Sequence, residues 1–169
     1  MNKNIVLIGL TGCGKSTVGK GLSRRLHLPF VDMDAYIEET EGKPIRQIFA
    51  DSGEAYFREL ETKAAKALSE RGGAIIATGG GAILNPENMA YLKQNGIILF
   101  LDRSPKEILK KLDVRNRPML QADKNYLYTL DKERRPLYQK YADITLYGSH
   151  PIWRAIYLAA KLVKPHLPS

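Results

Sequence analysis

The stretch Gly9-Leu10-Thr11-Gly12-Cys13-Gly14-Lys15-Ser16 fits the phosphate-binding pattern G-x-x-x-x-G-K-[ST]. It follows a short apolar run, Asn4 to Ile8, and precedes the segment Lys15 to Leu26, in which apolar residues recur at helical spacing. This order of strand, glycine loop and helix aims backbone N–H groups and a helix N-terminus at one anion. The sequence therefore predicts a cradle for the phosphates of a nucleotide, with a glycine-rich turn and a chance lysine as the alternative.

The cradle assigns roles to individual residues. We expect Lys15 to reach the β- and γ-phosphates as a catalytic group and Ser16 to bind Mg²⁺. Cys13 occupies a free position of the pattern, although a thiol near a helix N-terminus also allows a redox role. The residues expected to bind ATP here are Gly12, Cys13, Gly14, Lys15, Ser16 and Thr17.

Four further short apolar runs alternate with helical segments, and they are Pro29 to Val31, Ala74 to Thr78, Ile97 to Leu101 and Asp143 to Leu146. Helix starts are marked at Asn85-Pro86 and at Ser104-Pro105, where Glu107 completes a capping box. Continuous apolar strands separated by helices require a parallel sheet covered on both faces. The pattern predicts a three-layer α/β fold with five parallel strands, built around the phosphate-binding loop. We expect a single domain over residues 1–169, with a mobile lid at about 115–123.

The formal net charge of +8 favours anionic partners, which include nucleic acid, an acidic membrane surface and small phosphates or carboxylates. Cationic residues gather in Lys106 to Arg117 and Lys132 to Lys140. We expect these segments to face small anionic ligands. No nucleic-acid partner is expected, because a recognisable binding motif or a basic stripe with stacking aromatics is missing. No membrane partner is expected, because the longest apolar stretch, Gly96 to Leu101, is far shorter than a bilayer span. A single cysteine excludes an internal disulfide and favours the cytoplasm. A monomer is the expected state.

Three features mark the acceptor side of the predicted sheet edge. Asp32 and Asp34 lie two apart and would share one side of an extended segment, although Asp34 could instead cap the next helix. The glycines 79–81 indicate close approach of the backbone or a positive φ, or else a flexible connection. Arg58 and Glu61 lie three apart on a helix, so the carboxylate could hold the guanidinium for a ligand, or the two could form a plain surface pair.

In their joint order these motifs resemble shikimate kinase over nearly the whole chain. The resemblance rests on G-x-T-G-C-G-K-S, on D-x-D at 32–34, on F-R-x-x-E at 57–61, on T-G-G-G at 78–81, on R-P-x-L at 117–120 and on R-x-P-L-Y at 134–138. It implies the P-loop kinase fold for the three-layer α/β architecture. It also implies ATP-dependent phosphorylation of a shikimate hydroxyl to shikimate 3-phosphate, on the way to chorismate and aromatic amino acids.

The resemblance also implies site roles. Arg58 and Arg134 would bind the shikimate carboxylate, and Asp34 would bind its hydroxyls and act in catalysis. Arg117 would reach the ATP phosphates from the lid as a catalytic residue, and Asp32 would help Ser16 to hold Mg²⁺. Phe49 and Phe57 are either the apolar wall of the pocket or plain core. The implied shikimate-binding residues are Asp34, Arg58, Gly79, Gly80, Gly81 and Arg134.

Other interpretations stay open. A gluconate-type or nucleoside-monophosphate kinase would share the fold and the cradle, and a P-loop ATPase switch would hydrolyse ATP without a metabolite. A GTPase is disfavoured because the guanine-reading N-K-x-D motif is missing. The adenine contacts near Gly148 to Pro151 are left open, as is a second lid cation among Lys110, Lys111 and Arg115. Side chains expected to pack in the core are Tyr126, Tyr128, Tyr138, Trp153 and Tyr157, and no metal role is expected for His27, His150 and His166.

Overall fold

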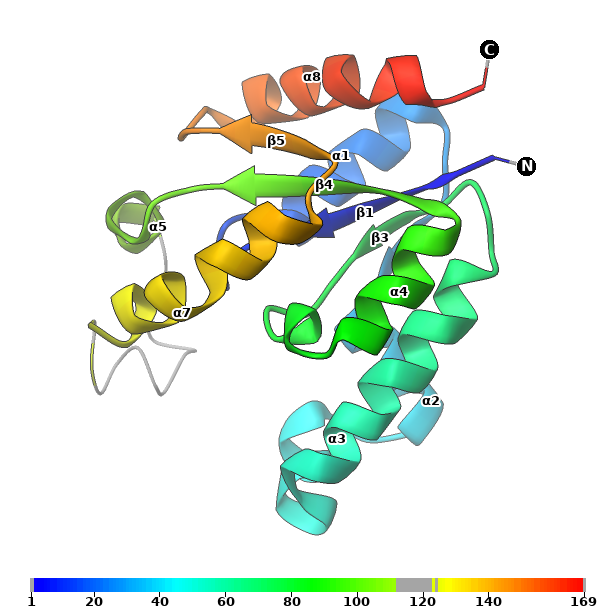
Figure 1. Ribbon diagram of the computed structural model, residues 1–169, viewed down its shortest axis with the longest axis vertical. Coiled ribbons are helices and arrows are strands. Elements are labelled where there is room, and N and C mark those ends of the chain that lie inside the picture. The colour runs from blue at the N-terminus through cyan, green and yellow to red at the C-terminus, as the bar shows by residue number, and fades with distance from the viewer. Residues whose placement is uncertain (1, 112–122, 124, 169) are drawn as a thin grey trace.

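The computed structural model describes residues 2–111, 123 and 125–168. Five parallel strands form one sheet in the order β2-β3-β1-β4-β5 (Figure 1). Each predicted strand is present, with ends that differ from the predicted ones by at most one residue. The strands are β1 (Asn4–Ile8), β2 (Phe30–Asp32), β3 (Ile75–Ala77), β4 (Gly96–Asp102) and β5 (Ile144–Tyr147).

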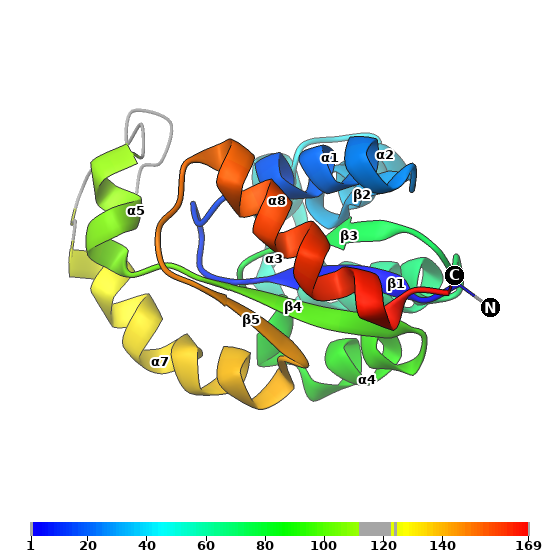
Figure 2. The same cartoon turned by 90° about the horizontal axis from the view of Figure 1, so that it is seen from above.

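Helices cover both faces of this sheet, as the apolar strands require. Seen from above in Figure 2, α1 and α8 lie on one face, and α4 and α7 lie on the other. The described helices are α1 (Lys15–Leu26), α2 (Met33–Glu41), α3 (Ile45–Ser69), α4 (Pro86–Gln94), α5 (Pro105–Lys111), α7 (Asn125–Tyr141) and α8 (Ile152–Val163), with short 3₁₀ turns η1 (Ala82–Leu84) and η3 (Lys164–His166). None of these helices combines the length and apolar character needed to cross a membrane.

The central strand β1 shows why the sheet forms from these residues. All five of its residues are buried, and Val6 pairs with Ile76 of β3 on one side and with Ile98 of β4 on the other. A strand with neighbours on both edges and helices on both faces is surrounded by protein, so it is apolar without alternation. Because all five strands are parallel, the loops that follow them emerge at one edge of the sheet, where ligands bind in this class of fold.

The predicted helix starts are confirmed. Asn85 Oδ1 accepts from the N–H of Glu87 at 3.0 Å at the start of α4, and Ser104 Oγ accepts from the N–H of Glu107 at 3.3 Å at the start of α5. Only this half of the expected capping box is formed. The Glu107 carboxylate instead accepts from Nζ of Lys110, one turn along the same helix.

The expected packing of aromatic side chains is partly wrong. Trp153 is 68% exposed and Tyr157 is 47% exposed, because α8 turns its small residues toward α1 and Ile156 fills the space over Gly21. Tyr128 on α7 is 47% exposed, whereas Tyr138 is buried. The predicted lid and its Arg117 lie outside the described residues, apart from Asp123.

Candidate active site

The phosphate-binding loop between β1 and α1 has the tight turns that its glycines predict. Gly12 and Gly14 have φ values of 80° and 100°, in the left-handed region that favours glycine. Nζ of Lys15 folds back over the loop and donates to the carbonyl of Gly9 at 2.7 Å and to that of Leu10 at 3.2 Å. The loop thus holds an ammonium group at the N-terminus of α1, a position suited to binding phosphate.

Ser16 and Asp32 meet beside this loop. Ser16 Oγ donates a 2.6 Å hydrogen bond to Oδ2 of Asp32. The other carboxylate oxygen of Asp32 accepts from the N–H groups of Asp34 at 3.0 Å and Ala35 at 3.2 Å. Two oxygen ligands of the type that Mg²⁺ prefers therefore lie together at the N-terminus of α1.

These bonds correct the prediction for the two aspartates. Asp32, not Asp34, caps α2, and the two carboxylates do not extend from one strand. The strand β2 ends at Asp32 because its side chain captures two N–H groups of the next turn, so Asp34 lies inside the first turn of the helix.

Asp34 nevertheless reaches the space beside the phosphate-binding loop. Burial raises the pKa of its carboxyl to about 6; the negative charges of Asp32 and Glu61 add to the rise, and the Lys15 ammonium opposes it. A carboxyl with such a pKa is suited to accept a proton from a hydroxyl near neutral pH. A cavity of about 310 Å³ brings these groups together, and it is lined by Thr11, Gly12, Gly14, Lys15, Ser16, Thr17, Asp32, Asp34, Thr78, Gly79 and Gly80.

The consecutive glycines after β3 leave room for side chains from other elements. A Cβ on Gly79 would lie 2.7 Å from Oδ1 of Asp34, and a Cβ on Gly81 would lie 2.7 Å from Nη1 of Arg58. Neither glycine has a positive φ. Close approach is therefore the reason for glycine here, and of the open interpretations only this one fits.

Gly80, between these two glycines, lies near Arg134, the third side chain predicted to bind shikimate. A Cβ there would lie 2.7 Å from the hydroxyl oxygen of Thr11 and 3.4 Å from Nη1 of Arg134. Arg134 comes from α7, whereas Arg58 comes from α3. Three successive glycines thus bring Asp34, Arg134 and Arg58 around one short segment.

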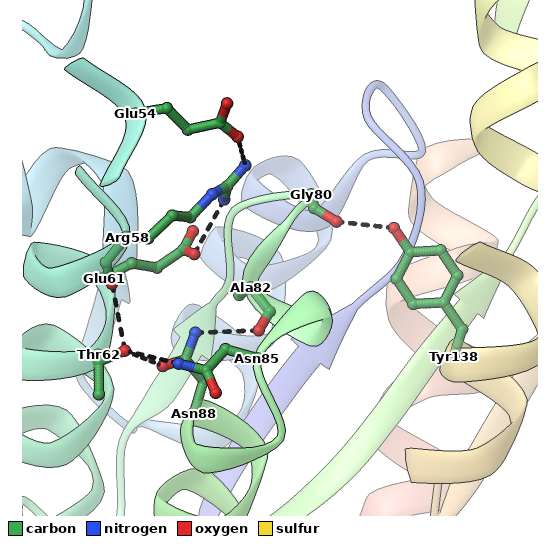
Figure 3. Close-up of polar contacts among 9 residues, drawn as sticks. All are labelled: Glu54, Arg58, Glu61, Thr62, Gly80, Ala82, Asn85, Asn88 and Tyr138. Carbon is green, nitrogen blue, oxygen red and sulfur yellow. Dashed lines mark hydrogen bonds and ion pairs between the residues drawn. The ribbon is translucent and has the colours of Figure 1, made fainter. Parts of the chain in front are cut away.

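Arg58 is held by two carboxylates (Figure 3). Its Nη1 donates to Glu61 at 3.0 Å and its Nη2 donates to Glu54 at 3.3 Å. Glu61 is 2% exposed and Glu54 is 69% exposed. Burial raises the pKa of Glu61, and the positive charges of Arg58 and Arg134 oppose that rise. The alternative of a solvated Arg58–Glu61 surface pair is therefore wrong.

A second cavity of about 300 Å³ lies on the other side of the phosphate-binding loop. Arg103, which the sequence interpretation missed, donates from Nη1 to the carbonyl of Cys13 and from Nη2 to Ser149 Oγ, both at 3.2 Å. Its place directly after a strand, at the ligand-binding edge, was a signal that could have identified it. The residues that line this second cavity include Gly12, Cys13, Gly14, Thr17, Arg103, Lys111, Gly148, His150 and Ile152.

The remaining candidates have plainer surroundings. Phe57 is buried and its ring centroid lies 4.8 Å from that of Phe49, which is 37% exposed. The Cys13 thiol is buried. His27 ends α1 with φ 55°. Within residues 2–111, 123 and 125–168, no cluster of three or more His, Cys, Asp or Glu side chains is arranged to hold a metal ion.

Comparison with known proteins agrees with this geometry. The family model of shikimate kinase matches residues 11–158 of the chain. A shikimate kinase of Clostridium botulinum strain Alaska E43 is 43% identical over 140 residues, which cover 83% of this chain and 84% of that protein. A solved shikimate kinase from Acinetobacter baumannii, in complex with shikimate, has a TM-score of 0.88 at 37% identity and covers 98% of this chain and 93% of its own. That of Aquifex aeolicus has a TM-score of 0.84 at 38% identity, covering 96% and 97%.

Proposed function

The chain belongs to the shikimate kinase family, and from this premise we propose how its residues carry out the reaction. The enzyme transfers a phosphoryl group from ATP to a hydroxyl of shikimate, a step of aromatic amino-acid biosynthesis. We propose shikimate 3-phosphate as the product. The observation that carries the assignment of residues is the glycine segment 79–81, which lies against Asp34, Arg134 and Arg58 at successive positions.

Shikimate is bound, in this proposal, between α3 and α7. Arg58 and Arg134 bind its carboxylate, because a guanidinium presents paired donors that match two carboxylate oxygens. Glu61 keeps Arg58 in place from the buried side. The exposed Glu54 occupies Nη2 of Arg58, and the substrate carboxylate would replace it there.

Asp34 orients the acceptor hydroxyl and accepts its proton. Its pKa of about 6 leaves it largely ionised at pH 7 and above, so it can act as the base. It lies in one cavity with Lys15 and Gly79, which places the acceptor next to the phosphate-binding loop. Alignment of the hydroxyl with the γ-phosphate is the main requirement of phosphoryl transfer.

ATP is bound by the loop residues Gly12, Cys13, Gly14, Lys15, Ser16 and Thr17. The Lys15 ammonium binds the terminal phosphates and stabilises the charge that develops on them. Ser16 and Asp32 fit Mg²⁺, since they join a hydroxyl and a carboxylate at 2.6 Å. When bound there, Mg²⁺ would neutralise charge on the phosphate oxygens.

The cavity beside Arg103 is proposed for the adenosine part of ATP. It shares Gly12 and Gly14 with the phosphate cradle and continues along the loop before α8. Arg117, from the predicted lid at 115–123, would add a positive charge to the transferring phosphoryl group. We further propose that residues 1–169 form one domain that acts as a cytoplasmic monomer without nucleic-acid or membrane partners.

Product identification tests this function. The chain is incubated with ATP, Mg²⁺ and shikimate, and ³¹P and ¹H NMR identify the hydroxyl that carries the new phosphate. We expect a phosphomonoester at the 3-hydroxyl. Phosphorylation of gluconate or of a nucleoside monophosphate in place of shikimate would contradict the proposal.

A further inference from the structure

Of the two helices that carry the proposed shikimate-binding arginines, α7 is hydrogen-bonded directly to the glycine segment 79–81, and α3 is connected through α4 to Ala82, the next residue after that segment (Figure 3). From α7, the Tyr138 hydroxyl donates to the carbonyl of Gly80 at 2.9 Å. From α4, which packs beside α3, Nδ2 of Asn88 donates to the carbonyl of Ala82 at 3.0 Å. These two bonds lie two residues apart on the same short segment.

Tyr138 is placed with little freedom to move. Its side chain is 1% exposed, and its ring stacks on Phe100 of β4 with centroids 5.1 Å apart. It lies one helical turn after Arg134, on the same face of α7. The Tyr138–Gly80 bond therefore connects the part of α7 that carries Arg134 to the glycine segment.

Asn88 has a matching place on the other side. It is fully buried, and its Oδ1 accepts from the Thr62 hydroxyl at 2.7 Å. Thr62 lies one turn after Arg58 on α3, and its oxygen also accepts from Nδ2 of Asn85 at 3.1 Å. A chain of hydrogen bonds thus connects the Arg58 turn, through Asn88, to the carbonyl of Ala82.

We propose that Tyr138, Asn88 and Thr62 are positioning residues that set the separation of Arg58 and Arg134, and so fix the grip on the shikimate carboxylate. This inference rests on the proposed function of the two arginines. The three side chains do not touch the substrate; they act through the segment Gly80 to Ala82. Tyr138 and Asn88 are buried and Thr62 is partly buried, so loss of one bond leaves a poorly solvated partner unsatisfied and lets the helix shift.

Tyr138→Phe tests the α7 side, with Tyr128→Phe as the matched control because Tyr128 is an exposed tyrosine on the same helix. We expect Tyr138→Phe to raise KM for shikimate about 3- to 10-fold, the effect of one neutral hydrogen bond, with KM for ATP unchanged. The control should match the wild type. With the methyl ester of shikimate, which lacks the carboxylate charge, the penalty should be much smaller.

Thr62→Val tests the α3 side, because it replaces the hydroxyl with a methyl group of similar size. Its control is Thr40→Val, because Thr40 is an exposed helical threonine whose hydroxyl donates to the carbonyl four residues earlier, that of Tyr36. If Tyr138→Phe fails to fold, Thr62→Val and its control test the inference on their own, with the same measurements and the same expected rise of KM for shikimate. Thermal unfolding of each variant shows whether it is folded at the assay temperature.

The outcomes separate this inference from the proposed function. A wild-type chain without shikimate-dependent turnover would overturn the proposed function and, with it, the inference. A wild type that turns over shikimate, with folded variants whose KM for shikimate is unchanged, would overturn the inference alone. An equal penalty on the methyl ester, or an equal rise of KM for ATP, would also overturn it. A penalty confined to the carboxylate-bearing acceptor supports it.

Discussion

The hydroxyl of Ser16 donates a 2.6 Å hydrogen bond to Oδ2 of Asp32. This bond joins the first turn of α1 to the end of β2. The second oxygen of Asp32 caps α2, so one carboxylate both organises the backbone and faces the phosphate-binding loop. The two uses can be separated by mutation, because an amide retains the capping oxygen but not the charge.

Asp32→Asn should raise the Mg²⁺ concentration for half-maximal activity about 10-fold, within the range found for groups that support a metal site. Its unfolding temperature should change little, since asparagine also caps helices well. Asp32→Ala should have the same metal defect and also lose about 1 kcal/mol of stability through the missing cap. Mg²⁺ titrations of activity, with thermal unfolding, check both. An unchanged Mg²⁺ dependence in Asp32→Asn would contradict the assignment of the metal site.

Asp34→Asn should reduce kcat about 100-fold or more, because it removes the proposed base, and leave the affinity for ATP nearly unchanged. Steady-state kinetics with shikimate and calorimetric titration with ATP measure the two quantities. A loss of ATP binding comparable to the loss of kcat would argue that Asp34 serves the nucleotide and not the acceptor.

The same substitution has an expected effect on stability. The pKa of Asp34 is about 6 in the folded chain, against an ordinary value of 3.8, so between these pH values the folded state keeps a proton that the unfolded chain releases. Wild-type stability should therefore fall as pH rises through this window, by at most about 3 kcal/mol. Asp34→Asn should be more stable than the wild type at pH 7.5 and lose this advantage near pH 4. Denaturant unfolding at the two pH values tests this sign.

Gly79→Ala and Gly42→Ala should have opposite effects. A Cβ at Gly79 would displace the Asp34 carboxylate without straining the backbone, so activity should fall at least 10-fold with stability nearly kept. Gly42 has φ 71° and open space around it, so alanine there should cost about 1 kcal/mol of stability and leave kcat unchanged. Kinetics and unfolding of both variants test the pair. Full activity in Gly79→Ala would contradict the close-approach role of that glycine.

Glu54→Gln should lower KM for shikimate about 2- to 3-fold, because its exposed carboxylate competes with the substrate for Arg58 and such a pair contributes less than about 1 kcal/mol. Glu59→Gln is the control, since Glu59 is an exposed glutamate on the same helix whose removal changes net charge equally. Steady-state kinetics at low ionic strength measure the effect. Equal KM values in the two variants would show that the long-range field, and not the Arg58 contact, is responsible.

Much of the phosphate cradle could be predicted from the sequence because its chemistry is local. The loop from Gly9 to Ser16 takes its shape from its own glycines and from the strand and helix on either side. The helix starts at Asn85 and Ser104 were predictable for the same reason, since a cap bonds to N–H groups two or three residues away.

The acceptor side depends on tertiary contacts, and the sequence could predict it only through resemblance. Spacing alone placed Asp34 on a strand, because it could not show that Asp32 would end β2 by capping. Nothing local shows that the glycines 79–81 lie against side chains from three other elements. The exposure of Trp153 was missed because a helix with apolar residues on several faces can bury its small ones instead.

The most direct test of the central claim is ADP release, followed with ATP and Mg²⁺, with and without shikimate, in the wild type and in Arg58→Ala. The account predicts turnover that depends strongly on shikimate in the wild type and collapses in Arg58→Ala, with ATP affinity retained. ATP hydrolysis that is indifferent to shikimate, or full shikimate-dependent turnover in Arg58→Ala, would contradict it.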